Sequence, residues 1–150
     1  VLWKIVLMTS RLEGGCYQLP DGRIHMLEVD DWISRTAYCG HYERDIFQCL
    51  REILTANDPV LDVGANKGVF AAMSSSFIGP GGFILCVEPS RLCWGSLETV
   101  TALLPTRVSI ATCALAAEAG NQPLYSPLES STSFHAALNQ DSPTFLTQQS

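Results

Sequence analysis

Polar and acidic residues follow two short apolar runs, and these residues are the best suited to chemistry. Asp62 and the turn Gly64–Gly68 stand at the end of the first run, and Glu88 follows the second. An open sheet of parallel strands binds its ligand beyond the carboxyl ends of the strands. Glu88 lies 20 residues after Gly68, the distance at which an acidic side chain reaches the ribose of a nucleoside held by a glycine turn. The spacing therefore predicts a nucleoside site.

The glycine pattern of the turn separates two kinds of nucleoside. A dinucleotide is held by G-x-G-x-x-G, whose second glycine lets the backbone approach the pyrophosphate. In Gly64-Ala-Asn-Lys-Gly68, Asn66 stands where that glycine would be. S-adenosyl-L-methionine has no phosphate and carries a sulfonium and an ammonium, which suit acceptors such as Asp62. The turn thus favours S-adenosyl-L-methionine as cofactor, and an NAD-dependent oxidoreductase is the alternative enzyme.

The elements that would position these residues alternate between strand and helix patterns. Short apolar, β-branched runs are typical of buried parallel strands, and the longer runs between them suit helices. The strand runs are 59–64, 83–87 and 107–113, and the helix runs are 69–79 and 91–104. This alternation predicts βαβαβ. We expect an α/β fold of the Rossmann-like, doubly wound kind with a mostly parallel sheet, in which 60–63 is a central strand, apolar on both faces.

Other local signals complete the expected elements. Ser90 is a candidate N-cap for the second helix, with Leu92, Leu97 and Val100 facing inward. Residues 14–29 flank the turn Pro20-Asp21-Gly22 and predict a small β-hairpin. An amphipathic helix is expected over residues 43–54, with Ile46, Phe47, Leu50, Ile53 and Leu54 at helical spacing and Asn57-Asp58-Pro59 stopping it. We divide the chain into an N-terminal hairpin extension at 1–40, a nucleoside-binding domain at 41–125 and an irregular polar tail at 126–150.

Composition excludes several classes of partner. The chain has 9 Lys and Arg against 15 Asp and Glu, a net charge of −6, so a nucleic acid backbone would be repelled. The apolar run at 1–8 is too short to span a bilayer. The six cysteines form no pairs of metal or redox spacing, and we expect them reduced and mostly buried in a cytoplasmic protein. Cys39-Gly40-His41 makes only half a metal site.

Several motifs together resemble the FkbM family of class I methyltransferases. They are, in order, Val60-Leu-Asp-Val-Gly-Ala-Asn-Lys-Gly-Val-Phe70, Gly79-Pro-Gly-Gly-Phe83 and Cys86-Val-Glu-Pro-Ser90. His41-Tyr42-Glu43 looks like the family's "YE" element, and Cys113-Ala-Leu-Ala-Ala117 with Gly120 looks like its "ALA…G" segment. The likeness runs from about residue 40 to 125. It implies an S-adenosylmethionine-dependent methyltransferase that acts on a hydroxyl of a sugar, glycolipid or natural product.

The resemblance also implies roles for individual residues. Gly64, Asn66 and Gly68 would wrap the methionine and ribose portions of the cofactor, while Glu88 would accept hydrogen bonds from both ribose hydroxyls. Asp62 would position the turn or bind the donor's ammonium. Glu43 would close the methionine side. Trp94, Leu92, Cys113 and Ala114 are candidates to border the adenine, although such residues are more often core, and Lys67 is expected to be exposed and without a role.

The end of the chain departs from the family pattern. The family's fourth parallel strand, read as "KIDVEG", has no counterpart after Tyr125. We therefore expect a sheet truncated after its third strand, with most cofactor contacts, little of the acceptor site and no general base. Residues 1–150 alone are expected to fold marginally and to be inactive. A non-catalytic remnant that binds a nucleoside or serves as a scaffold is the alternative outside the enzymes.

Overall fold

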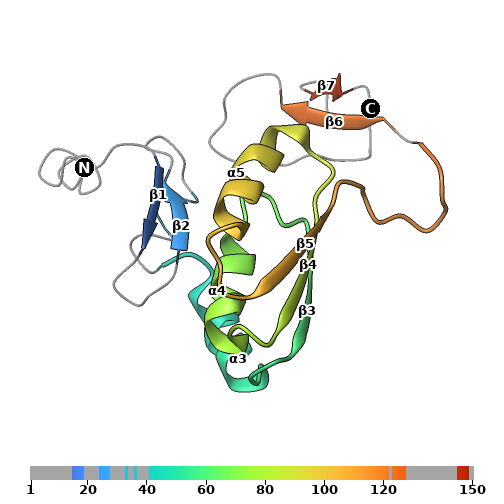
Figure 1. Cartoon of the computed structure of the whole chain (residues 1–150). Coiled ribbons are helices and arrows are strands. Elements are labelled where there is room, and N and C mark those ends of the chain that lie inside the picture. The colour runs from blue at the N-terminus through green and yellow to red at the C-terminus, as the bar shows by residue number, and fades with distance from the viewer. Residues whose placement is uncertain are drawn as a thin grey trace, which may run out of the picture.

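The computed structural model describes residues 15–18, 24–27, 33, 36, 41–121, 123–127 and 145–148. Figure 1 shows its strands and helices. They are, in chain order, β1 (Gly15–Gln18), β2 (Ile24–Leu27), α3 (Arg44–Ile53), β3 (Pro59–Val63), α4 (Val69–Ile78), β4 (Phe83–Val87), α5 (Arg91–Thr101), β5 (Arg107–Ala111), β6 (Leu124–Pro127) and β7 (Phe145–Gln148). The expected hairpin at 14–29 is confirmed, because β1 and β2 pair antiparallel.

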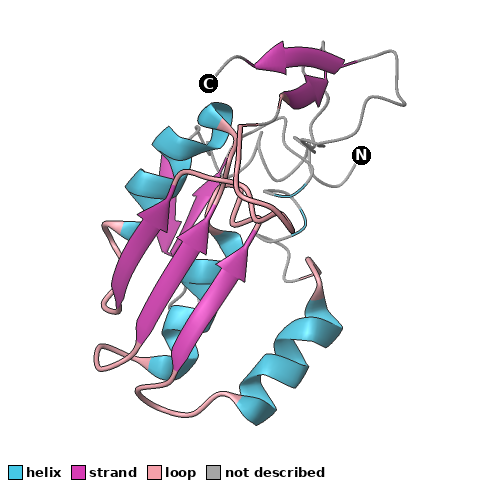
Figure 2. Ribbon diagram, turned by 90° about the vertical axis from the view of Figure 1, so that its right-hand side faces the viewer, coloured by secondary structure: helices cyan, strands magenta, loops and turns pink. Residues whose placement is uncertain are grey.

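β3, β4 and β5 form one parallel sheet in that order. Pro59 of β3 lies opposite Phe83 of β4, and Phe83 lies opposite Arg107 of β5, so the three strands begin and end level. α4 and α5 connect the strands and lie on the same side of the sheet (Figures 1 and 2). The predicted α/β class with a Rossmann-like βαβαβ unit is confirmed. Among the described strands, no fourth one joins this sheet, and β6 and β7 pair only with each other.

Alternate residues of the sheet build the core against α4 and α5. Ile84 and Cys86 of β4 are fully buried, and they pack with Ala71, Ile78 and Leu97 of the two helices. On α5 the buried stripe runs through Cys93, Leu97 and Val100. The prediction that Leu92 faces inward was wrong, since its side chain is 52% exposed. At helical spacing the buried stripe passes through Cys93, and Leu92 lies one position before it.

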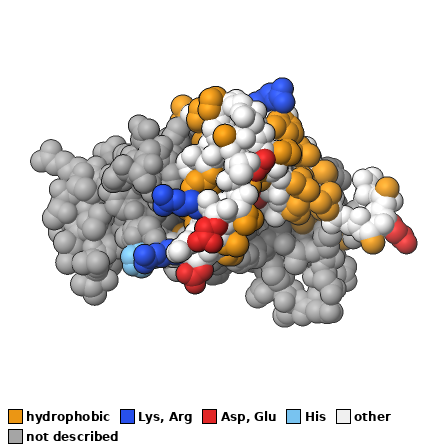
Figure 3. All heavy atoms as spheres, turned by 90° about the horizontal axis from the view of Figure 1, so that it is seen from below, with side chains coloured by type: hydrophobic (Ala, Val, Ile, Leu, Met, Phe, Trp, Pro, Cys, Tyr) orange, Lys and Arg blue, Asp and Glu red, His pale blue; other side chains and the backbone are white. Residues whose placement is uncertain are grey.

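The other face of the sheet corrects the prediction that β3 is buried on both sides. Leu61 and Val63 are 58% and 55% exposed. Among the described strands β3 stands at the edge of its sheet, and both connecting helices lie on the opposite face. Figure 3 shows hydrophobic side chains gathered on the side of the molecule where the strands lie in Figure 1. In the part of the chain that the structure describes, this apolar face is open.

α3 packs against α4 rather than against the sheet. Phe47 is buried and its ring stacks on that of Phe70 at 5.1 Å, whereas Ile46 and Ile53 are exposed. The prediction that Asn57-Asp58-Pro59 stops this helix was also wrong in detail. The helix ends at Ile53, since Leu54 is already extended, and Pro59 is the first residue of β3. The expected helix is thus confirmed, but its apolar face is only partly buried.

The remaining segments bear less directly on the site. The backbone of β2 lies against α4 and α5. β6 and β7 form an antiparallel pair, so the stretch 126–150, which was expected to be an irregular polar tail, contributes residues 126–127 and 145–148 to strands. The apolar run at 1–8 lies outside the described residues. None of the helices that the structure describes is long and apolar enough to cross a bilayer.

Candidate functional site

A cavity of about 330 Å³ opens at the carboxyl end of β3. It lies where the topology of a parallel sheet predicts a ligand site. The structure brings four of the six predicted site residues to this cavity: Glu43, Asp62, Gly64 and Asn66. Gly68 and Glu88 do not line it. The other residues of its wall are Ile33, Tyr42, Val63, Ala65, Lys67, Val69 and Phe70.

The turn that forms one wall of the cavity contains three residues with a left-handed backbone conformation. Gly64, Asn66 and Gly68 have φ of 79°, 50° and 87°, and asparagine is one of the few residues other than glycine that adopt this region readily. A Cβ at Gly68 would lie 3.1 Å from Leu97 Cδ1, so this glycine also lets α5 approach the turn. The Gly-Ala-Asn-Lys-Gly sequence is therefore explained by backbone geometry before any ligand is considered.

Glu88 ties this turn to the end of β4. Its side chain is buried, its Oε2 accepts from the backbone N–H of Asn66 at 2.8 Å, and its Oε1 accepts from the N–H of Ser90 at 2.8 Å. The backbone N–H groups of Gly64 and Ala65 donate to Val87 O at 2.9 and 3.1 Å. Glu88 thus stands behind the turn and holds it in shape. Ser90 lies at the expected N-cap, but its side chain makes no cap hydrogen bond.

Asp62 points toward α4, beside the thiol of Cys86 on the next strand. Burial, reinforced by the negative charge of Glu88, raises the pKa of Asp62 to about 6, although a hydrogen bond from the backbone N–H of Ala71 opposes the rise. Its Oδ2 is buried and accepts no hydrogen bond. Burial and the charge of Asp62 raise the pKa of Cys86 to about 12, so Cys86 is an un-ionised thiol.

Lys67 was predicted to be exposed, and that prediction was wrong. Its side chain is only 5% exposed and lines the cavity. The reason is the conformation of its neighbours, since Asn66 and Gly68 both have positive φ and the chain curls at this point. Lys67, Tyr42 and Phe70 are wall residues that sequence reasoning missed. Tyr42 and Phe70 both belong to the motifs that resemble the FkbM family, and this is the signal that could have identified them.

Glu43 reaches the cavity from the start of α3, where its backbone is left-handed with φ of 44°. Its side chain is exposed.

The candidates for an adenine border are less well placed. Trp94 is half-buried and its Nε1 donates to Glu88 O at 2.9 Å, with the Arg91 guanidinium 5.7 Å from the ring centroid. Leu92, Cys113 and Ala114 are exposed.

The cysteines and candidate metal ligands do not form a second site in the described residues. Cys86 and Cys93 are buried as expected, but Cys49 and Cys113 are exposed, and all four are free thiols. The expectation of mostly buried cysteines therefore holds for only two of these four. Within the same ranges, no three His, Cys, Asp or Glu side chains lie together as metal ligands would.

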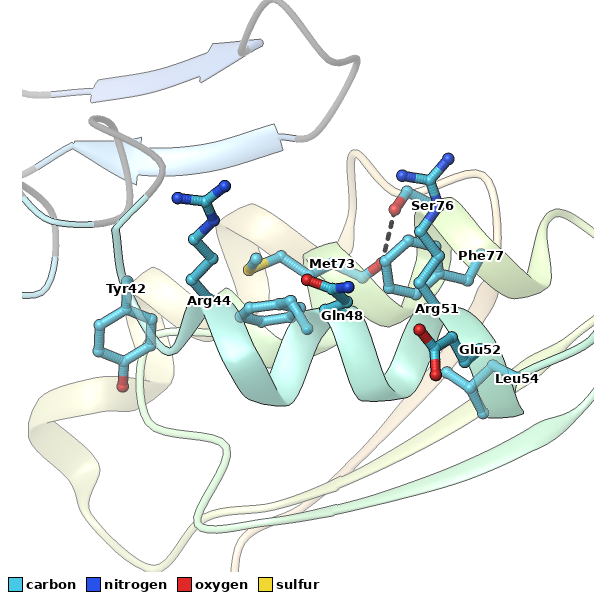
Figure 4. A pocket seen from close by; sticks show the side chains of 10 residues that line it. Tyr42, Arg44, Gln48, Arg51, Glu52, Leu54, Met73, Ser76 and Phe77 are labelled. Atoms are coloured by element: carbon cyan, nitrogen blue, oxygen red, sulfur yellow. Dashed lines mark hydrogen bonds between the residues drawn. The ribbon is translucent and has the colours of Figure 1, made fainter.

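A second and larger hollow, of about 1120 Å³, runs along α3 and α4. Figure 4 shows Arg44 and Arg51 projecting from the same side of α3, with Met73 and Phe77 from α4 nearby. Ser76 Oγ donates to Met73 O at 2.6 Å. Tyr42 lines both this hollow and the cavity beside β3. The two therefore adjoin at the start of α3.

Comparison with known proteins adds little to this geometry. No protein-family model matches the chain. No curated protein matches it either. A crystal structure titled "putative rRNA-methylase" from Clostridium thermocellum is similar over 47% of this chain and 39% of that chain, with a TM-score of 0.44 and 18% identity. An overlap this small carries no argument about function, so the case rests on the residues of the site.

Proposed function

We propose that the chain is the donor-binding part of an S-adenosylmethionine-dependent methyltransferase. One observation carries the proposal: the cavity at the carboxyl end of β3 is walled by the left-handed turn Gly64–Gly68 and by two carboxylates, Glu43 and Asp62. Acceptors of this kind suit a ligand with a sulfonium and an ammonium. Asp62, which lines this cavity, is the proposed partner of the ammonium.

The same geometry speaks against a dinucleotide. A pyrophosphate is bound by free backbone N–H groups at such a turn. Here the N–H of Asn66 donates to Glu88, and those of Gly64 and Ala65 donate to Val87 O. Carboxylates at Glu43 and Asp62 would also repel a phosphate. The nicotinamide-dependent oxidoreductase is therefore the less favoured enzyme.

The proposed roles follow the resemblance, with one change. Gly64, Asn66 and Gly68 shape the wall against which the methionine and ribose portions lie, and Glu43 closes the methionine side. Both carboxylate oxygens of Glu88 already hold backbone N–H groups. We therefore propose that Glu88 acts by positioning the turn.

The chemistry we propose is methyl transfer to a small-molecule or glycan hydroxyl. When bound, S-adenosylmethionine supplies an electrophilic methyl group that is open to in-line attack. The residues of this chain bind and orient the donor, and holding the reactants in near-attack geometry is the main contribution to rate that such a site can make. We assign no general base to the cavity.

Binding measurements test this proposal. We expect the full-length protein that carries these residues to bind S-adenosylmethionine and S-adenosylhomocysteine in isothermal titration calorimetry, and to bind NAD at least about tenfold more weakly. Binding of NAD without a response to either methyl-donor species would overturn the assignment in favour of the oxidoreductase. Absence of binding by all three ligands would favour the scaffold remnant.

A further inference from the structure

The hollow along α3 and α4 carries a charge opposite to that of the donor cavity it adjoins. Among the described residues that line the hollow, Arg44 and Arg51 are cationic and Glu52 is acidic. The described wall of the donor cavity has two carboxylates and one ammonium. The whole chain has a net charge of −6, so a hollow with an excess of positive charge departs from the balance of the protein. This charge favours a second ligand that is anionic.

The two arginines are placed to act together. Arg51 follows Arg44 by nearly two turns of α3, so both project from one side of the helix, about 10 Å apart along its axis (Figure 4). Both are exposed, and no side chain in the described part of the chain pairs with either guanidinium. Arg44 stands in the first turn, where the helix dipole disfavours a cation. Helix stability therefore does not explain this residue.

The hollow also has an apolar floor below the arginines. Phe47 and Met73 are buried, and Phe77 packs against the same cluster. All three line the hollow, whose volume is about 1120 Å³. Ligand sites combine such an apolar lining with a few polar groups that fix the orientation of the ligand. The hollow thus suits an elongated ligand with acidic groups on one side and C–H surface, as in sugar rings, on the other.

An aromatic wall joins this hollow to the donor cavity. Tyr42 lines both, and its ring meets that of Phe70 edge-on at 6.4 Å. Phe70 lines the donor cavity, and Phe47, which lines the hollow, stacks on its ring. Methyl transfer requires the acceptor to lie next to the donor. A ligand in the hollow meets that requirement at Tyr42.

We propose that this hollow binds the methyl acceptor, and that the acceptor is a glycan whose acidic groups are held by Arg44 and Arg51. The inference rests on the proposed function and names the chemical class of the acceptor. A guanidinium binds a carboxylate or a phosphate through two parallel N–H···O bonds. The acidic group is therefore the carboxylate of a uronic acid or the phosphate of a sugar phosphate.

A matched pair of probes isolates the charge. Digalacturonate and its dimethyl ester have the same sugar rings, and the ester lacks the two negative charges. We expect the full-length protein, saturated with S-adenosylhomocysteine, to bind digalacturonate at least about tenfold more tightly than the ester in isothermal titration calorimetry. Glucose bisphosphate is the probe for phosphate, and the tighter of the two acidic probes identifies the acidic group.

Variants of the hollow locate the contact. Arg44→Met and Arg51→Met should each lose about 10-fold in affinity for the acidic probe, and the double variant about 100-fold, since each removes a charged hydrogen-bond donor. Their affinity for S-adenosylhomocysteine should stay within about twofold, which also shows that they are folded. Arg107→Met is the control, because it removes the same charge from the start of β5 and lines neither cavity. It should leave both affinities unchanged.

The outcomes separate this inference from the proposed function. Equal binding of digalacturonate and its ester with no binding of glucose bisphosphate, or unchanged affinity for the acidic probe in the double variant, would overturn the inference while the donor site stands. Displacement of the acidic probe by S-adenosylhomocysteine would do the same, because the probe would then occupy the donor cavity. A protein that binds no methyl-donor species would overturn both. Binding that requires the acid and the arginines, with the donor site filled, supports the inference.

Discussion

Replacing Glu88 by alanine should lower the free energy of unfolding by about 3–6 kcal/mol, since hydrogen bonds to a charged group contribute about 1.5–3 kcal/mol each. Glu88 makes two such bonds, to the backbone N–H groups of Asn66 and Ser90, at 2.8 Å each. Alanine leaves both donors without their partner. Because Asn66 lies in the wall of the donor cavity, the same change should weaken S-adenosylhomocysteine binding by about 1.5–3 kcal/mol.

Urea denaturation and calorimetry with S-adenosylhomocysteine measure the two effects. Glu98→Ala is the matched control, because Glu98 is an exposed glutamate on α5 and its loss changes the net charge equally. Glu88→Gln keeps one acceptor oxygen and should be intermediate, so it reports on the turn if the alanine variant does not fold. Equal unfolding free energies for Glu88→Ala and Glu98→Ala would show that Glu88 is only a helix-end residue.

Residues 1–150 alone should self-associate through the open face of the sheet. Leu61 is 58% exposed on β3, and β3 is an edge strand whose apolar face lies away from α4 and α5. Large exposed apolar patches of this kind favour association. Leu61→Lys should weaken the association roughly 10- to 100-fold, because covering a leucine contributes about 1.5–3 kcal/mol.

Sedimentation equilibrium over a range of concentrations checks this expectation. Leu115→Lys adds the same charge at a leucine that is 57% exposed after β5, and it should leave the association unchanged. A wild-type monomer with a sharp cooperative thermal transition would contradict the argument from the exposed face.

The limits of the strands were predictable because local sequence signals mark where each strand begins and ends. Phe83–Val87 has the predicted limits, since two glycines precede it and Glu88-Pro89 follows. The exposure of Leu61 and Val63 was not predictable in this way. An apolar β-branched run looks alike in a central strand and in an edge strand, and only the tertiary arrangement decides which face is covered.

The candidate site was likewise predictable only in part. The rule that ligands bind beyond the carboxyl ends of parallel strands brought Asp62 and the glycine turn together correctly. The inward position of Lys67 depends on the positive φ of Asn66 and Gly68, and no pattern of residue types encodes the direction in which that turn curls. For the same reason, the sequence does not reveal that Glu88 accepts hydrogen bonds from backbone N–H groups.

A crystal structure of the full-length protein with S-adenosylhomocysteine tests the central claim most directly. We expect the ligand at the carboxyl end of β3, with its amino-acid end beside Asp62 and Glu43 and its ribose on the side of the turn held by Glu88. A ligand bound instead in the hollow along α3 and α4, with the cavity beside the Gly64–Gly68 turn empty, would contradict it.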